Sequence, residues 1–311
     1  MAYEYHKPIL TKEVLDGLAE CIQRIVVDAT AGGLGHSTEI AKRLPAGGVL
    51  VCIDKDAESL GSGLAVGGER FAECDTIFVQ DDFANIKRIL AEHGIGEVDA
   101  VVADLGVSSH QIDTAERGFS YTKDGPLDMR MDRGQKRDAA HVVNNYSEER
   151  LVEIIKTYGE ERFAKRIAAA IVRGRPVGST MQLAKIITEA VPGNYYKTGG
   201  HPAKRTFQAI RIEVNRELES LEIFIRDAVG ALRPGGRIAV ITCHSLEDRI
   251  VKQAFRFLAA ECVCPPKTPV CICGHKATLR VLTKKPILPC AAEVRDNPRA
   301  ASAKLRLGER I

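Results

Sequence analysis

The segment that most constrains the fold is an apolar strand that breaks into glycines and then leads into a helix. Residues 25–37 read Ile-Val-Val-Asp-Ala-Thr-Ala-Gly-Gly-Leu-Gly-His-Ser. β-Branched residues favour an extended strand, whereas glycines permit a sharp turn and let the backbone approach a ligand with no Cβ in between. The free N–H groups at the start of the next helix are donors for that ligand. This order of elements predicts a nucleotide-cofactor site at the turn.

A second apolar strand supports the same interpretation. It covers 48–53 and ends at Asp54, about 20 residues after the glycines, where dinucleotide-binding folds hold the ribose hydroxyls with an acid. Further apolar strands are predicted at 76–79, 98–103 and 237–242. Such uniformly apolar strands are typical of a parallel sheet covered by helices on both faces. We therefore predict an α/β fold with a doubly wound, Rossmann-like sheet whose ligands bind at the carboxyl ends of the strands.

Length and composition restrict the class of protein. The chain has 311 residues, of which 45% are hydrophobic and 27% charged, with a net charge of +3. These values are typical of a globular enzyme and exclude a disordered or strongly basic chain. No apolar run reaches the roughly 18 residues needed to cross a bilayer, and the first residues lack the apolar core of a signal peptide. We expect a cytoplasmic protein with no membrane partner.

The pattern changes near Gln111, where polar residues and glycines replace the strands. Helical segments follow at 148–173 and 180–191. We predict that residues 112–200 form an inserted helical subdomain for substrate recognition, and that 1–111 and 201–311 together form the cofactor-binding domain. A single long helix is expected over 203–232, because its apolar residues keep helical spacing.

Binding sites for two cofactors, NAD and S-adenosylmethionine, have a glycine turn and a ribose-binding acid in common. Gly32, Gly33 and Gly35 are too closely spaced for the G-x-G-x-x-G fingerprint of dinucleotide sites. Residues 80–83, Gln-Asp-Asp-Phe, offer an acid and an aromatic ring where adenosylmethionine enzymes hold the adenine by hydrogen bonding and stacking. These features favour S-adenosylmethionine. An NAD-dependent oxidoreductase and an RNA-binding assembly factor without turnover are the alternatives.

Several long blocks of the sequence resemble the bacterial RsmH (MraW) family. These blocks lie at 28–37, 104–109, 116–120, 124–131, 158–167, 204–211 and 244–249. The resemblance extends over essentially the whole chain and implies a class I methyltransferase fold that uses S-adenosylmethionine. It also implies an enzyme that methylates the exocyclic N4 amine of a specific cytidine in the decoding region of 16S ribosomal RNA. The implied partner is 16S rRNA within the small ribosomal subunit or its precursor.

The resemblance further implies which residues form the site. The implied cofactor-binding residues are Leu34, Gly35, His36, Asp54, Phe83, Asp104 and Gln111. Leu34 stands where some members have glycine, so we expect a backbone contact there.

Asp104 is also the candidate catalytic residue. A hydrogen-bond acceptor beside the amine would free the nitrogen lone pair, which is otherwise delocalised into the cytosine ring. The alternative is that Asp104 only orients the amino group of the cofactor. The loop lacks the prolines and the aromatic residue of the Asp/Asn/Ser-Pro-Pro-aromatic motif of other amino methyltransferases, so both roles stay open.

The residues after the strand at 237–242 also have two interpretations. His244 and Ser245 either line the pocket for the base or cap the helix that follows, together with acids in its first turn.

Basic residues suggest where RNA phosphates bind. Residues 276–311 contain nine Lys or Arg against three acids, and we interpret this segment as a phosphate-binding tail. Arg130 and the basic residues of 162–166 are further candidates, although a solvated helix face is the default for such charges. Phe119 and Tyr121 are candidates for stacking on bases.

The nine cysteines fall into two kinds. Cys21, Cys52, Cys74 and Cys243 lie singly in apolar contexts and are expected to pack as core residues. Cys262, Cys264, Cys271 and Cys273 form two C-x-C pairs, a compact layout for tetrahedral zinc. Whether the four bind a metal is left open by the sequence.

Overall fold

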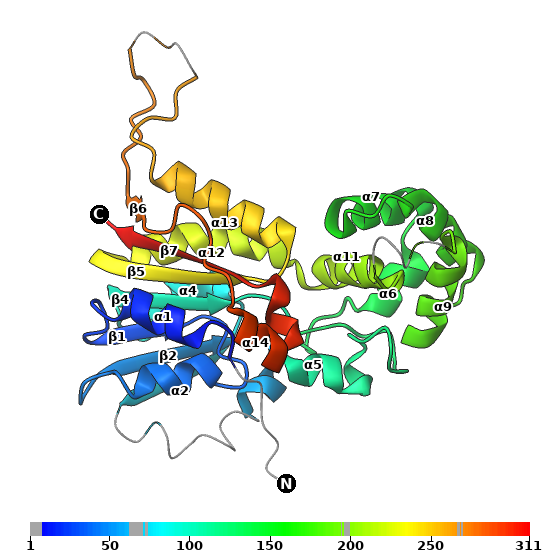
Figure 1. Ribbon diagram of the computed structural model, residues 1–311, viewed down its shortest axis with the longest axis horizontal. Coiled ribbons are helices and arrows are strands. Elements are labelled where there is room, and N and C mark those ends of the chain that lie inside the picture. Colours follow the sequence, from blue (N-terminus) through cyan, green and yellow to red (C-terminus); the bar gives the residue numbers. More distant parts are fainter. Residues whose placement is uncertain are drawn as a thin grey trace. The chain divides into compact units, whose positions relative to one another are not determined.

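The protein forms two compact units in the computed structural model, which describes residues 8–61, 71, 74–193, 195, 200–265, 268 and 270–311 (Figure 1). The first unit combines 1–106 with 218–311, and the second comprises 107–217. The segment 112–200, expected as the insertion, falls within the second unit.

The first unit is built on a mixed seven-stranded sheet, which confirms the predicted doubly wound α/β fold. Its strands are β1 (Ile25–Asp28), β2 (Val49–Asp54), β3 (Asp75–Gln80), β4 (Val98–Asp104), β5 (Leu232–Thr242), β6 (Leu279–Val281) and β7 (Lys304–Arg310). They follow the order β3-β2-β1-β4-β5-β7-β6, and the pairings from β3 to β5 are all parallel. From β1 the chain adds β2 and β3 on one side of the sheet and then β4 and β5 on the other, so the strand order reverses between β1 and β4. A crevice for ligands forms at the carboxyl ends of strands at such a switch point.

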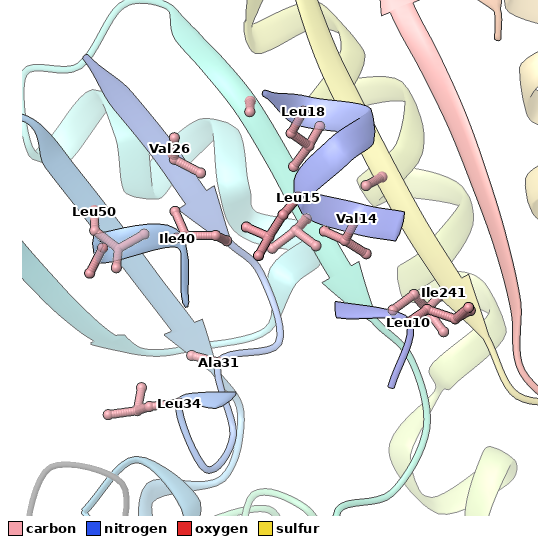
Figure 2. Packing of buried hydrophobic residues seen from close by; sticks show 14 of the residues in the cluster. Leu10, Val14, Leu15, Leu18, Val26, Ala31, Leu34, Ile40, Leu50 and Ile241 are labelled. Carbon is pink, nitrogen blue, oxygen red and sulfur yellow. The ribbon is translucent and has the colours of Figure 1, made fainter. Parts of the chain in front are cut away.

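Alternating apolar residues bury both faces of this sheet. Val26 faces a core with α1 (Thr11–Leu18) and α2 (Gly35–Ala41), as Figure 2 shows. The next residue, Val27, faces the opposite core, which contains α4 (Ile86–Glu92), α12 (Glu217–Ala231) and α13 (Ser245–Leu258). Successive side chains of a strand point to opposite faces, so a strand that is apolar throughout requires helices on both sides.

The C-terminal segment corrects one prediction. Residues 304–310 are not a tail but the strand β7, which lies between β5 and β6 and runs antiparallel to both. Its Leu305 and Leu307 are buried, and its charged side chains have partners: Arg306 donates to Asp248 at 2.7 Å, and Arg237 donates to Glu309 at 3.0 Å. The interpretation of this segment as a tail is therefore wrong for β7, whereas phosphate binding by residues 276–311 stays a prediction.

The predicted long helix over 203–232 is also wrong. The chain forms α11 (Ala203–Asn215) and α12 (Glu217–Ala231), separated by Arg216 with a φ of 55°. This left-handed conformation ends α11, and β5 begins at Leu232 directly after α12. Both helices bury one face, so the apolar spacing continues across Arg216. The sequence pattern therefore gives no sign of the break.

The second unit is helical. It contains α5 (Ser109–Asp113), α6 (Ala139–Asn145), α7 (Glu148–Gly159), α8 (Ala164–Arg173), α9 (Thr180–Ala190) and α11. Asp138, Ser147 and Ser179 cap α6, α7 and α9 by accepting backbone N–H groups. The guanidinium of Arg117 is buried, where it donates to the carbonyl of Arg130 at 2.8 Å.

Among the helices that the structure describes, none is long and apolar enough to cross a bilayer.

We predict a strong contrast between two neighbours on α12. Phe224 is fully buried and its ring lies 5.0 Å from that of Phe83, whereas Ile223 is 43% exposed. Phe224→Ala leaves a cavity in the core and should cost about 3–5 kcal/mol of unfolding free energy, against about 0.5 kcal/mol or less for Ile223→Ala. Urea unfolding followed by circular dichroism measures both. Equal losses would contradict the packing described for α12.

Candidate active site

The predicted site residues of the first unit gather at the carboxyl ends of its parallel strands. The glycine turn follows β1, Asp54 ends β2, Phe83 follows β3 and Asp104 ends β4. The parallel register from β3 to β4 places these positions along one edge of the sheet. This is the edge where a doubly wound sheet binds its ligand.

The turn after β1 is held by the acid that ends the strand. The buried Asp28 accepts from the hydroxyl of Ser37 at 2.6 Å and from the N–H of Thr30 at 3.2 Å. Burial raises the pKa of Asp28, although these donors and the nearby charge of His36 oppose that effect. The carboxylate thereby joins the strand to the first turn of α2.

Leu34 and Gly35 shape the start of α2. Leu34 has a φ of 62° and its side chain is buried in the core, so a ligand at this turn can meet only its backbone. A Cβ on Gly35 would lie about 3.0 Å from Pro8, which explains the glycine there. Gly32 has a φ of 46°, a conformation that other residues rarely adopt.

Asp54 accepts two backbone N–H groups. Its Oδ2 lies 2.7 Å from the nitrogen of Gly32 and its Oδ1 lies 2.8 Å from that of Asp56. Burial raises the pKa of this carboxyl to about 7, and the two N–H donors only partly offset that effect. Each oxygen keeps a second lone pair that can accept a ligand hydroxyl.

Asp104 lies between a hydroxyl and an imidazole. Its backbone N–H donates to the hydroxyl of Thr30 at 2.6 Å, which ties the end of β4 to the turn after β1. Its Oδ2 lies 3.5 Å from Nε2 of His36, and both side chains are largely buried. The structure therefore brings His36 and Asp104 together.

His36 is polar, buried and incompletely bonded. Among the described residues neither of its ring nitrogens makes a hydrogen bond of normal geometry, although Nε2 faces Asp104. Burial disfavours the charged imidazole, but Asp104 and the charge of Asp28 outweigh this and raise the pKa of His36. A buried ring of this kind is suited to contact a bound ligand.

The segment after β3 holds Phe83 at the same edge. Asp82 caps the short helix Phe83–Asn85 through the N–H of Ala84 and forms an ion pair with Lys55 at 2.7 Å. Phe83 is half-buried, with its ring tilted against Phe224. The remaining exposed part of the ring is available to a planar group.

Gln111 belongs to the second unit. Its side chain accepts from the N–H of Ser108 at 3.0 Å, while the hydroxyl of Ser108 accepts from the N–H of Gln111 at 3.2 Å. This reciprocal pair caps α5. The structure gives Gln111 a capping role, and its contact with the cofactor stays a prediction.

The structure favours the capping interpretation of His244. Its side chain accepts from the N–H of Glu247, whose carboxylate accepts in turn from the N–H groups of Cys243 and His244. Ser245 is the first residue of α13.

Two of the suggested RNA contacts in the second unit are engaged elsewhere. Arg130 binds Asp128 through Nε at 2.7 Å and Nη2 at 2.9 Å, and Phe119 is buried in the core of this unit. Tyr121 is half-buried and stacks on His201 with the ring centroids 4.6 Å apart. Lys165 and Arg166 on α8 are exposed.

Two further residues, Thr30 and Lys55, position the site and were not predicted from the sequence. Thr30, two residues after the end of β1, binds the Asp104 backbone, and Lys55, directly after the end of β2, binds Asp82. Their positions just after parallel strands could have indicated this role, because side chains that follow such strands line the edge of the sheet where ligands bind.

Comparison with known proteins identifies the family. Residues 3–311 match the model of the MraW methylase family. The chain is 50% identical over 309 residues to Ribosomal RNA small subunit methyltransferase H of Halothermothrix orenii, covering 98% of each protein. It is 49% identical over 311 residues to the protein of the same name in Lachnospira eligens, again with 98% of each covered. The resemblance inferred from the sequence blocks is thus confirmed, and the chain belongs to the MraW methylase family.

Proposed function

We propose that this protein transfers a methyl group to the exocyclic N4 amine of a specific cytidine in the decoding region of 16S ribosomal RNA. At the level of the family, it is an S-adenosylmethionine-dependent methyltransferase of small-subunit ribosomal RNA. The proposal concerns the atom that is methylated, its place in the RNA and the residues that act on it.

The observation that carries the proposal is the position of Asp104. Its carboxylate lies at the end of β4, is fixed through its own backbone by Thr30, and faces His36. When bound, S-adenosylmethionine supplies an electrophilic methyl group on a positively charged sulfur. The cytosine amine attacks it poorly, because its lone pair is delocalised into the ring. An acceptor that draws on an amine N–H localises that lone pair and takes the proton that leaves as the N–C bond forms.

The neighbouring side chains fit the cofactor. Asp54 would accept the ribose hydroxyls, and the half-buried ring of Phe83 would pack on the adenine. Leu34 and Gly35 would contribute backbone, and His36 would contact the methionine part together with Asp104. The carboxylates of Asp54 and Asp104 complement the cationic sulfonium and ammonium groups.

The second unit is proposed to recognise the RNA, with Gln111 at its start contributing to the cofactor site. Its exposed Lys165 and Arg166 are suited to phosphate contacts. We thus propose that the unit 107–217 recognises the substrate, apart from Gln111, and that the rest of the chain binds the cofactor.

The methylated atom can be tested directly. The purified protein is incubated with labelled S-adenosylmethionine and small ribosomal subunits from a strain that lacks the modification. Nucleoside mass spectrometry of the 16S rRNA should then detect N4-methylcytidine, and mass spectrometry of nuclease fragments should locate it at a single position in the decoding region. Heat-inactivated protein is the control. A methyl group on a ring carbon or on a ribose hydroxyl would overturn the proposal.

The raised pKa of Asp54 predicts a pH dependence of cofactor binding. The ionised carboxylate binds the ribose hydroxyls, and its fraction falls as the pH drops below about 7. Affinity should therefore be about tenfold weaker at pH 6 than at pH 8. Asp54→Asn should flatten this profile and cost roughly 1.5–3 kcal/mol of binding free energy at pH 8. Titration calorimetry measures both quantities.

A matched control for that experiment is Asp75→Asn. Asp75 is exposed at the start of β3, at the edge of the sheet opposite the site. The pH dependence of cofactor affinity in the Asp75→Asn protein should therefore match that of the wild type. An Asp54→Asn protein that keeps the wild-type pH profile would remove Asp54 from the site.

The two roles of Asp104 predict different kinetics. If the carboxylate accepts from the cytosine amine, Asp104→Asn should lower single-turnover rates about 10² to 10⁴-fold even at saturating cofactor. If it mainly holds the cofactor ammonium, the same change should weaken cofactor binding by about 1–3 kcal/mol, and saturating cofactor should restore the rate. Full activity at saturation would leave Ser108, Ser109 or a backbone carbonyl of the same loop as the acceptor.

A further inference from the structure

The four clustered cysteines lie outside the methyl-transfer site. They belong to the loop between α13 and β6, which extends away from the sheet in Figure 1. Cys262 and Cys264 come first in the chain, and Cys271 and Cys273 follow them.

The sulfur atoms of these four residues converge on one point. The Sγ of Cys271 lies 3.5 Å from that of Cys262, 3.9 Å from that of Cys264 and 3.5 Å from that of Cys273. The Sγ atoms of Cys273 and Cys262 lie 3.8 Å apart, and all four atoms lie within 4.8 Å of one another.

These separations fit four ligands of one tetrahedral ion. Zinc binds thiolate sulfur at about 2.3 Å, so two sulfurs at a tetrahedral angle are about 3.8 Å apart. A disulfide requires sulfurs at about 2.05 Å, and all four cysteines are free thiols in the structure. The arrangement therefore suits a shared cation better than a pair of covalent cross-links.

Backbone amides support the sulfur cluster. The N–H of Val263 points to the Sγ of Cys273 at 3.5 Å, and the N–H of Cys264 points to the Sγ of Cys262 at 3.4 Å. Amide donors of this kind stabilise the negative charge of thiolates, which are the form that binds metals.

The loop buries little apolar surface of its own. Val270 and Ile272 are 72% and 84% exposed. Contacts occur at the base of the loop, where His275 packs on Phe257 with the ring centroids 4.7 Å apart and the N–H of Thr278 donates to the carbonyl of Leu258 at 2.8 Å. Ordering a segment costs conformational entropy that apolar burial normally offsets, and a metal can replace that burial in a small loop.

We propose that Cys262, Cys264, Cys271 and Cys273 bind one Zn²⁺ ion as a structural site. Four protein ligands leave no open coordination position, so the ion holds the loop and takes no part in methyl transfer. Each thiol that binds gives up its proton to solvent, and no electron is transferred. This proposal is independent of the methylated atom and of the role of Asp104.

The test is the metal content of the full-length protein, purified under reducing conditions without a metal-affinity step. Mass spectrometry of the elements should find about one zinc per chain, and Cys271→Ser combined with Cys273→Ser should reduce this at least about tenfold. Cys290→Ser is the matched control, because Cys290 is exposed in the same unit but outside the cluster, and it should keep the zinc.

Two further measurements identify the ligands and the effect of the ion. Replacing zinc by Co²⁺ should give thiolate charge-transfer bands and the intense visible bands of a tetrahedral sulfur site. Removing the metal with a chelator should accelerate amide hydrogen exchange in residues 259–279 about tenfold or more, with S-adenosylmethionine affinity unchanged.

Several results would overturn the proposal. The proposal fails if the wild-type protein binds the cofactor but contains no stoichiometric metal. It also fails if intact-mass measurement under the same conditions detects a disulfide among the four cysteines. Iron in place of zinc would refute the identity of the ion. Zinc retained by the double serine variant would refute the ligand assignment.

Discussion

The parallel pairing of β1 with β4 is the constraint on which the candidate site depends. It sets the turn after β1 beside the end of β4, and the hydrogen bond from the Asp104 N–H to the Thr30 hydroxyl fastens the two together. Asp28 then fixes the turn from within by binding Ser37 of α2. Asp104 and His36 meet because both strand ends are held by buried hydrogen bonds, which are costly to leave unpaired.

Burial gives this edge of the sheet its electrostatic character. Asp28 and Asp54 both have raised pKa values because the fold removes them from water. For Asp54 this makes the folded chain without ligand more stable below pH 7, and that contribution is lost as the pH rises from the unfolded pKa of about 4 through the folded value of about 7. Above pH 7 the buried, ionised carboxylates destabilise the fold, and a cationic ligand that binds them offsets part of this loss of stability. Under the proposed function, folding favours the protonated form of Asp54 and cofactor binding favours its ionised form.

Ion pairs hold β7 to its neighbours in the fold. In the sequence, the basic residues of these pairs resemble a phosphate-binding surface. Arg306 and Lys304 of β7 bind Asp248 of α13, while Arg237 and Arg280 of the neighbouring strands bind Glu309. Local composition cannot reveal such pairs, since the partners are 29 to 72 residues apart. Arg130 differs, because its partner Asp128 is only two residues away and the ion pair depends on the conformation of that loop.

The sequence by itself determined the parallel strands, the glycine turn and the acids that end β2 and β4, because burial on both faces and a sharp turn each require particular residue types at regular spacing. It also identified the family and the four grouped cysteines. Only the tertiary structure decided that β7 is a sheet strand, that Arg216 divides α11 from α12, and that Gln111 and His244 act as helix caps. It also brought His36 to Asp104 and the four sulfurs to one point. The position of β7 and the meeting of His36 with Asp104 depend on contacts between distant segments, and the free energy of those contacts is absent from any local pattern. The two helix caps and the break at Arg216 are local conformations, for which the residue types alone left more than one outcome open.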